Sequence, residues 1–391
     1  MSKDSIPEAK GGTPEALGES NKILILNGLR TRGTMSRADL CRLLGMSFPA
    51  VSSNVKSLID IGYVVEVGEG DNSLGRKSTL LSYHAERGYV LGVDLGRFRI
   101  RVMFADLLGR ELSSLERPTN TKDGGTGVAD ELKEMLLDVV AASGKDKASI
   151  LSICIGVPGV LSEDSVTLAP FLPPIDLTQI RTKIREEFAA PVIIENSINL
   201  GALGEMWHGA GRELKNFALI NYGVGVGAAF IINGELYPGA HRASGEIGFM
   251  VGDPSKLRAE FDEVGVLENT ISRDKIQNYI MRPDFQDEIN KLIEKYKKND
   301  VYAKLILDEI FLYVGISLIN ISAVLDLEAV IISGGLGNSI GRLFSKKWGE
   351  MLAVHVPYPP RLVFSELENQ EGVLGAIHVA LEAVYREPLK V

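Results

Sequence analysis

The sequence predicts an α/β protein in which an N-terminal winged helix-turn-helix is followed by a duplicated, two-lobed α/β domain. Three observations support this prediction. Residues 21–62 hold three short amphipathic segments separated by glycines, as in a helix-turn-helix. From Gly88 onward, apolar strands alternate with glycine-rich turns and helices. A series of three strands occurs twice, at 89–116 and 218–237, and indicates two halves with a cleft between them.

Charge is divided unevenly along the chain. The 391 residues carry a net charge of −9, which excludes a protein that coats nucleic acid or anionic membrane over its whole surface. Residues 21–83 nevertheless hold eight basic and five acidic side chains, a net charge of +3. A small basic module therefore precedes a large acidic one, and nucleic acid is a candidate partner for the basic module.

Cysteine content and apolar runs indicate the compartment. Cys41 and Cys154 are too few for a disulfide framework or for a thiolate zinc site without other ligands, and they suit a reducing compartment. The longest apolar run, 311–325, is interrupted by polar residues and falls short of a membrane span. Residues 1–20 lack the apolar core of a signal peptide. We therefore expect a cytoplasmic protein without a membrane partner.

The length and the changes of pattern divide the chain into four segments. We expect a flexible tail at 1–20, a winged helix-turn-helix at 21–85, a first lobe at 86–208 and a second lobe at 209–391. In this division the C-terminal helix of the second lobe packs back on the first lobe.

Glycines and capping residues define the helices of the front module. A first helix is predicted before Gly33 by apolar residues that recur at helical spacing: Ile23, Leu24, Leu26 and Leu29. A second helix follows Ser36, an expected N-cap with Asp39 in the capping-box position. The third begins near 47–49, with a proline in its first turn, and ends at Gly62. Two strands, 63–67 and 78–83, then flank a wing tip at 68–77.

In a helix-turn-helix, the second helix of the motif enters the major groove of DNA. The third predicted helix offers small polar side chains there, and the wing tip offers cations for the backbone or the minor groove. The residues expected to contact DNA are Ser36, Ser47, Phe48, Ser52, Ser53, Asn54, Lys56, Arg76 and Lys77. The alternative is a winged helix used only for contact with another protein.

Three glycine clusters follow predicted strands of the large module: 94–96, 223–227 and 334–337. Backbone N–H groups in such turns can cradle phosphate. One glycine cluster is more often a simple tight turn, but three of them in a duplicated fold favour a nucleotide-type cleft.

The longest motif of the large module resembles the central signature of the ROK family, which contains repressors, open reading frames and sugar kinases. The motif runs from Gly223 through 233–240 to the sequence Gly-Glu-Ile-Gly at 245–248. The segments 94–96, 195–205 and 332–335 resemble the family's phosphate loop, sugar-proximal helix and adenosine-side turn. The resemblance implies a duplicated actin-like ATPase fold, which is ribonuclease H-like, and the winged helix is typical of the family's repressor branch.

Departures from the kinase pattern remove particular chemistry. Family kinases carry a catalytic aspartate where this chain has Ser197, whose hydroxyl cannot act as a base at neutral pH. Arg97 and Phe98 replace small residues of the first phosphate loop, and Val224 replaces a threonine of the second. The comparison with the kinases therefore implies lost phosphotransfer, with no catalytic residue and no cofactor.

The resemblance also implies a lost zinc site and a retained sugar pocket. The family's zinc ligands correspond here to Phe249, Ala259, Phe261 and Val266, none of which binds metal, so no metal is expected. Polar residues remain at positions that contact sugar hydroxyls in the family. These sugar-binding candidates are Asn196, Glu246 and Glu268.

Taken together, the sequence predicts a sugar-responsive, DNA-binding repressor of carbohydrate-metabolism genes, such as those of xylose metabolism. Its expected partners are double-stranded operator DNA and a sugar or sugar-derivative effector, and it is expected to form a homodimer or tetramer. The main alternative is an ATP-dependent sugar kinase with an appended DNA-binding domain. An activator, or a regulator that docks a partner protein, is the third possibility.

Overall fold

The structure is a computed structural model that describes residues 14–70, 78–120, 127–162, 165–168, 175–223, 225–273, 276 and 285–387. The chain forms two compact units. Unit 1 comprises residues 1–89, 106–110 and 385–391, and unit 2 comprises residues 90–105 and 111–384.

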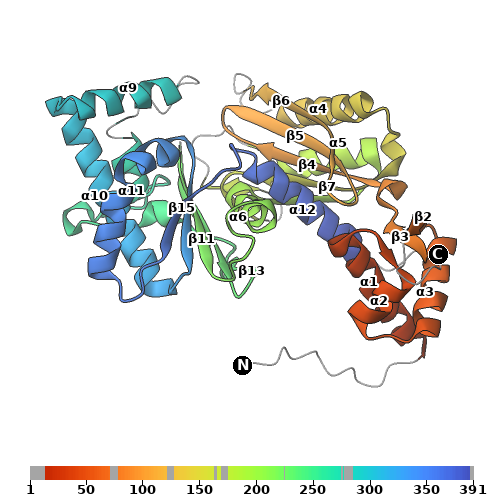
Figure 1. Cartoon of the computed structure of the whole chain (residues 1–391). Coiled ribbons are helices and arrows are strands. Elements are labelled where there is room, and N and C mark those ends of the chain that lie inside the picture. Colours follow the sequence, from red (N-terminus) through yellow and green to blue (C-terminus); the bar gives the residue numbers. More distant parts are fainter. Residues whose placement is uncertain are drawn as a thin grey trace. The chain divides into compact units, whose positions relative to one another are not determined.

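Unit 1 combines three helices with a three-stranded antiparallel sheet of order β1-β3-β2 (Figure 1). The elements are α1 (Pro14–Arg32), β1 (Met35–Ser36), α2 (Arg37–Leu44), α3 (Phe48–Asp60), β2 (Val64–Gly70), β3 (Ser78–Tyr83) and the 3-10 turn η1 (Ala85–Arg87). The three predicted helices and both predicted strands are present, whereas the short strand β1 was not predicted.

The capping signals explain where these helices begin. Ser36 and Asp39 form a reciprocal capping box at the start of α2, and the Ser47 hydroxyl accepts from Ala50 N at the start of α3. The α1 side chains correct one detail of the predicted helix face. Ile25 is fully buried, whereas Ile23 and Leu24 are exposed. The face of α1 that packs into the core therefore includes Ile25 and excludes Ile23 and Leu24.

Helix α1 also corrects the predicted tail. The helix begins at Pro14, so the flexible segment expected at 1–20 is wrong for residues 14–20. Proline is favourable in a first helical turn, and Glu15, Ala16 and Leu17 are good helix formers, so the local sequence favours this earlier start. Residues 1–13 lie outside the described residues.

Two distant segments of the chain complete unit 1. Leu107 N donates to Ala85 O over 3.1 Å, and the Tyr385 hydroxyl donates to Leu107 O over 2.5 Å. The Arg30 guanidinium lies 3.6 Å from the centre of the Tyr385 ring, a cation–π contact. The unit therefore includes more of the chain than the contiguous segment 21–85.

Unit 2 contains two five-stranded sheets. The first has the order β10-β7-β4-β5-β6, and the second has the order β13-β12-β11-β14-β15. Numbered in chain order within each sheet, the first sheet read from its β6 edge and the second read from its β13 edge both have the order 3-2-1-4-5. The strands are β4 (Tyr89–Leu95), β5 (Arg99–Asp106), β6 (Glu111–Pro118), β7 (Ile150–Val157), β10 (Val192–Asn196), β11 (Phe217–Tyr222), β12 (Val226–Ile232), β13 (Glu235–Leu236), β14 (Ala329–Ser333) and β15 (Arg361–Phe364).

Helices cover these sheets, and α6 packs against strands of both (Figure 1). The helices are α4 (Val128–Ser143), α5 (Leu177–Phe188), α6 (Ser197–His208), α7 (Val266–Glu268), α9 (Phe285–Lys297), α10 (Val301–Leu325), α11 (Gly335–His355) and α12 (Glu371–Arg386). The small elements are the hairpin β8 (Val160–Leu161) with β9 (Val166–Thr167), the 3-10 turns Lys147–Ser149, Ile247–Phe249 and Pro254–Lys256, and the π-helical turn Asn269–Arg273.

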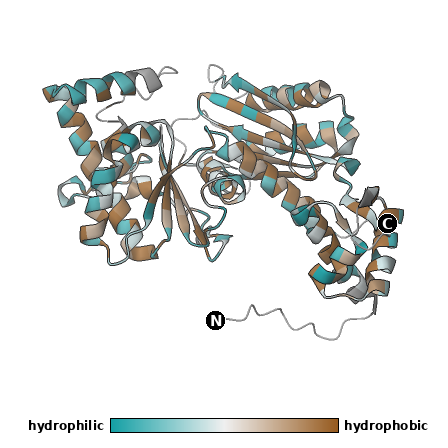
Figure 2. Ribbon diagram, in the orientation of Figure 1, coloured by the Kyte–Doolittle hydropathy of each residue, from teal (hydrophilic) through white to brown (hydrophobic). Residues whose placement is uncertain are grey.

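The core of the second sheet is strongly apolar. Strand β14 is buried at all five positions, and Figure 2 shows the strands of this sheet as mainly hydrophobic and α9 as largely hydrophilic. Among the described helices, α10 is the one long and apolar enough to cross a membrane, although 56% of its most apolar window is buried. That burial is typical of a core helix.

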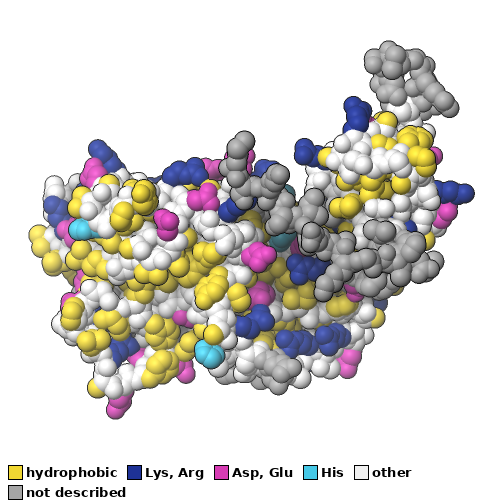
Figure 3. All heavy atoms as spheres, turned by 90° about the horizontal axis from the view of Figure 1, so that it is seen from below, with side chains coloured by type: hydrophobic (Ala, Val, Ile, Leu, Met, Phe, Trp, Pro, Cys, Tyr) yellow, Lys and Arg dark blue, Asp and Glu magenta, His cyan; other side chains and the backbone are white. Residues whose placement is uncertain are grey.

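Hydrophobic side chains also reach the surface. Figure 3 shows them in several places on one face of the molecule, among charged side chains. Three of the most exposed, Val301, Tyr302 and Leu305, lie on the first turns of α10.

Candidate functional site

The first candidate sugar-binding residue, Asn196, lies at the junction of β10 and α6. Asn196 is buried and caps α6, because its Oδ1 accepts from Ile198 N at 2.8 Å and Asn199 N at 3.4 Å. Its Nδ2 donates to Gly159 O over 2.8 Å, so the orientation of the amide is fixed. An amide nitrogen carries two hydrogens, and the second Nδ2 hydrogen can serve a ligand.

Glycines in the family signature (223–248) leave room for this segment to lie close to the start of α6. A Cβ on Gly227 would lie 3.5 Å from Ile198 Cδ1 and 3.9 Å from Gly245 O. Gly245 O accepts from Ala228 N over 2.7 Å. Gly245 has φ +94°, and a Cβ there would lie 1.8 Å from Ala228 O, so only glycine fits. The next residue is Glu246, which is thereby held near the start of β12.

Both candidate glutamates lie near the first residues of β12. Burial raises the pKa of the Glu246 carboxyl above its ordinary value. Glu268 Oε2 accepts from Val226 N over 3.3 Å. A Cβ on Gly248 would lie 2.9 Å from that same oxygen. The structure therefore gathers Asn196, Glu246 and Glu268 around the start of β12.

Two of the three glycine clusters also meet. A Cβ on Gly334 would lie 2.6 Å from Tyr222 O, and Asn221 Nδ2 donates to Ser333 Oγ over 3.4 Å. The carboxyl ends of the parallel strands β11 and β14 are thus adjacent, as the predicted cleft requires. Val224 lies outside the described residues.

The first glycine cluster follows β4 in the other sheet. Gly96 N donates to Arg99 O over 3.0 Å, which closes a tight turn around the two bulky replacements Arg97 and Phe98. The Arg97 guanidinium lies 5.5 Å from the centre of the Phe98 ring, and burial lowers the pKa of Arg97. Both side chains are partly buried in the loop where kinases of the family carry small residues.

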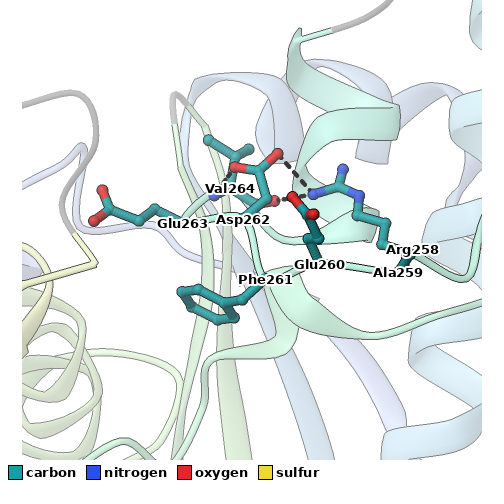
Figure 4. A pocket seen from close by; sticks show the side chains of 7 residues that line it. All are labelled: Arg258, Ala259, Glu260, Phe261, Asp262, Glu263 and Val264. Carbon is teal, nitrogen blue, oxygen red and sulfur yellow. Dashed lines mark hydrogen bonds and ion pairs between the residues drawn. The ribbon is translucent and has the colours of Figure 1, made fainter.

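Aromatic packing occupies the segment where the family carries zinc ligands. The Phe249 and Phe261 rings stack with centroids 5.8 Å apart and an interplanar angle of 6°. Residues 258–264 line a surface hollow in which Arg258 pairs with Asp262 over 2.9 Å (Figure 4). Among the described residues, no three His, Cys, Asp or Glu side chains are arranged to hold a metal ion.

A group of acidic side chains that was not predicted lies at the start of α12. The carboxyl of Asp94 packs against Gly372, and Arg101 Nη1 lies 3.8 Å from Asp94 Oδ2. Within the described chain, Glu205 Oε1 and Glu371 Oε2 are buried without a hydrogen-bond partner. Burial raises the pKa of Asp94 to about 6 and that of Glu371 to about 7, the latter helped by the charges of Asp94 and Glu205. No local motif marks these residues in the sequence.

We expect these carboxyls to make stability fall as the pH rises from about 4 to about 7. Their pKa values are higher in the folded chain than in the unfolded chain, so the folded state binds more protons over this interval. The stabilisation that the two protonated carboxyls provide at low pH is therefore lost as the pH rises through their pKa values in the folded chain. Glu371→Gln is expected to flatten the decrease of Tm measured by differential scanning calorimetry. Glu186→Gln, an exposed change on α5, should follow the wild type, and a Glu371→Gln profile as steep as the wild type would contradict this assignment.

Unit 1 exposes much of the predicted DNA-binding face. Four of the predicted contact residues are exposed on α3 or at its N-cap: Ser47, Phe48, Ser53 and Lys56. The Phe48 residue is 57% exposed to solvent. Ser52 and Asn54 are half-buried, and Asn54 Nδ2 donates to Ala50 O.

The prediction that Ser36 contacts DNA is wrong. The residue is 5% exposed, and its hydroxyl is engaged with Asp39 in the capping box, so it serves the fold of α2. The predicted wing contacts Arg76 and Lys77 lie outside the described residues.

Comparison with known proteins identifies the family. The model of the ROK family matches residues 90–383, three quarters of the chain and almost all of unit 2. The chain belongs to the ROK family. Its resemblance to that family, first seen in the glycine-rich signature, is therefore confirmed.

Relatives of this ROK protein include both regulators and kinases. A xylose repressor of Caldicellulosiruptor bescii is 28% identical over 96% of this chain and 99% of its own length. A glucokinase of Halalkalibacterium halodurans is 28% identical over 74% of this chain and 94% of its own. A crystal structure of a ROK family transcriptional regulator, a homologue of the E. coli MLC protein, superposes with a TM-score of 0.74 at 21% identity, over 95% of this chain and 98% of its own.

Proposed function

We propose that this ROK protein is a sugar-responsive transcriptional repressor of carbohydrate-metabolism genes. The observation that carries the proposal is the share of this chain that each relative matches. The repressor and the regulator span 96% and 95% of the chain, whereas the glucokinase spans 74%. The difference corresponds in size to the N-terminal unit, which is the part a regulator needs in order to bind DNA.

The N-terminal unit is proposed to be a winged helix-turn-helix, with residues 21–85 as its contiguous part. Helices α2 and α3 with Gly45 between them form the motif, and β2 and β3 form the wing. The exposed face of α3 would enter the major groove, with contacts from Ser47, Phe48, Ser52, Ser53, Asn54 and Lys56. Arg76 and Lys77 would contact DNA from the wing.

The ROK domain is proposed to bind the effector. Asn196, Glu246 and Glu268 offer an amide and two carboxylates around the start of β12, a combination that suits the hydroxyls of a neutral sugar. The shared 3-2-1-4-5 strand order supports a duplicated actin-like fold, with lobes at 86–208 and 209–391 that open and close on the sugar.

Regulation is proposed to follow from a difference in affinity between two states. A sugar that binds the state unable to bind DNA about tenfold more tightly shifts the equilibrium by ~1.4 kcal/mol. The protein would act in the cytoplasm as a homodimer or tetramer, because two-fold symmetry matches a pseudo-palindromic operator.

The alternative function, an active sugar kinase with an appended DNA-binding domain, is favoured by the similarity to the glucokinase. Ser197 at the start of α6 cannot accept a proton from a sugar hydroxyl as an aspartate does, and Arg97 with Phe98 crowds the first phosphate loop. We therefore expect no phosphorylation of hexoses or pentoses above background in a coupled ADP-release assay with ATP and magnesium. Turnover that disappears in an Asn196→Ala variant would establish the kinase instead.

The proposal is tested by capturing sheared genomic DNA with the purified protein and sequencing what is retained, with and without a mixed pool of sugars. We expect a short pseudo-palindrome with half-sites spaced by whole helical turns of ~10 bp, upstream of sugar-transport or catabolic genes and released by the pool. No enrichment in either condition would contradict DNA binding and favour a module that docks a partner protein.

A further inference from the structure

Arg242 adopts a backbone conformation that its residue type disfavours. Its φ is +56°, in the left-handed region where a residue with a Cβ is strained. Arg242 lies in the turn between β13 and Glu246, where its N–H donates to Gly239 O at 3.4 Å. It is not at the end of a helix, where such a conformation is common. The chain therefore tolerates strain at a position that glycine would fill without it.

The side chain of Arg242 reaches the residue next to the sugar candidate Asn196. Its Nη2 lies 2.6 Å from Glu195 Oε2. The other oxygen of Glu195 accepts from Asn196 N at 2.9 Å and from Asn199 Nδ2 at 3.0 Å. The Arg242 guanidinium thus orients the Glu195 carboxylate, which in turn accepts hydrogen bonds from the start of α6.

The same pair ties together two segments of the proposed sugar site. Arg242 belongs to the loop that continues through Gly245 to Glu246, while Glu195 and Asn196 end β10. The carboxylate side chain is 17% exposed and the arginine side chain 56%, so this ion pair lies at the surface of the site. Exposed pairs add little to global stability, which leaves local positioning as their main effect.

We infer that Arg242 is a positioning residue for the sugar effector, which sets the placement of Asn196 relative to Glu246 through its ion pair with Glu195. The inference rests on the proposed function of this site. It makes a specific prediction about Arg242→Gly, because that change removes the ion pair and also relieves the backbone strain. Stability and effector affinity should then respond differently to one substitution.

The experiment uses the full chain and isothermal titration with d-xylose and d-glucose, together with Tm by calorimetry. Arg242→Gly is expected to weaken sugar binding about tenfold, which corresponds to ~1.4 kcal/mol, while Tm stays unchanged or rises. Arg242→Lys retains the charge and should keep wild-type affinity within about threefold, or ~0.65 kcal/mol. The control Arg117→Gln breaks the exposed ion pair between Arg117 on β6 and Asp138 on α4 and should leave affinity unchanged.

The ionic strength of the titration adds a readout that a purely structural role does not affect. Wild-type affinity should fall between 50 mM and 500 mM salt because the ion pair is screened, and the affinity of Arg242→Gly should not. Equal affinity of Arg242→Gly and wild type would overturn the inference while leaving the proposed function intact. Absence of binding of both sugars to the wild type would overturn the sugar site and this inference with it.

Discussion

Gly375→Ala is expected to destabilise the ROK domain by about 3 kcal/mol or more, because α6 and α12 cross without room for a methyl group. A Cβ on Gly375 would lie 1.8 Å from Leu200 O, and one on Gly204 would lie 2.1 Å from Glu371 O. The obstructing atoms are backbone carbonyls, which cannot rotate away as a side chain can. The helices would have to separate, and α6 carries Asn196 at its start.

The matched control is Gly349→Ala in the middle of α11. A Cβ there meets nothing within 4 Å, so alanine should stabilise the helix by about 0.5–1 kcal/mol through its lower backbone entropy in the unfolded chain. Chemical unfolding monitored by circular dichroism gives both values. A loss below about 1 kcal/mol for Gly375→Ala would show that the crossing relaxes and is not a fixed point of the fold.

Ser53→Glu is expected to lower operator affinity at least about 100-fold, because it places a carboxylate on the exposed face of α3 that is proposed to meet DNA. A loss of that size corresponds to ~2.7 kcal/mol, in the range for an unfavourable charge at a binding surface. Ser53 is exposed, so the fold should be unaffected. Fluorescence anisotropy with the captured operator measures the change, and unaltered circular dichroism excludes unfolding.

Asn27→Glu on α1 is the matched control for charge. The residue is exposed, and its side chain already accepts from Arg30, so a glutamate there keeps a basic partner. Operator affinity should change less than about threefold, or ~0.65 kcal/mol. If both variants lost affinity equally, the effect would be one of overall charge, and α3 would not be the recognition helix.

Local patterns were sufficient to predict most elements of the fold. Ser36 with Asp39 predicted the start of α2 because a capping box is a local hydrogen-bond device. Strand β3 was predicted at its observed bounds from an alternating apolar run. Strand β15 was not predicted, because Arg361–Phe364 is short. Helix α5 was overlooked although its buried apolar residues recur at helical spacing: Leu177, Ile180, Ile184 and Phe188.

Candidate site residues were named where a motif was present, whereas residues placed by non-local contacts were missed. Asn196, Glu246 and Glu268 follow from segments that resemble the family signature. Glu371 and Arg242 became visible only in the structure, because one depends on burial beside Asp94 and the other on a left-handed backbone. Neither burial between distant segments nor a positive φ at arginine has a signal in the local sequence.

The central claim is that a sugar bound by the ROK domain controls binding of DNA by the N-terminal unit. The most direct measurement is operator affinity by anisotropy, with and without a saturating sugar, for the wild type and for Glu246→Gln. We predict that sugar weakens wild-type operator binding about tenfold or more, while Glu246→Gln binds the operator normally and responds only at much higher sugar concentration. Operator affinity that no sugar alters, or a response unchanged by Glu246→Gln, would contradict it.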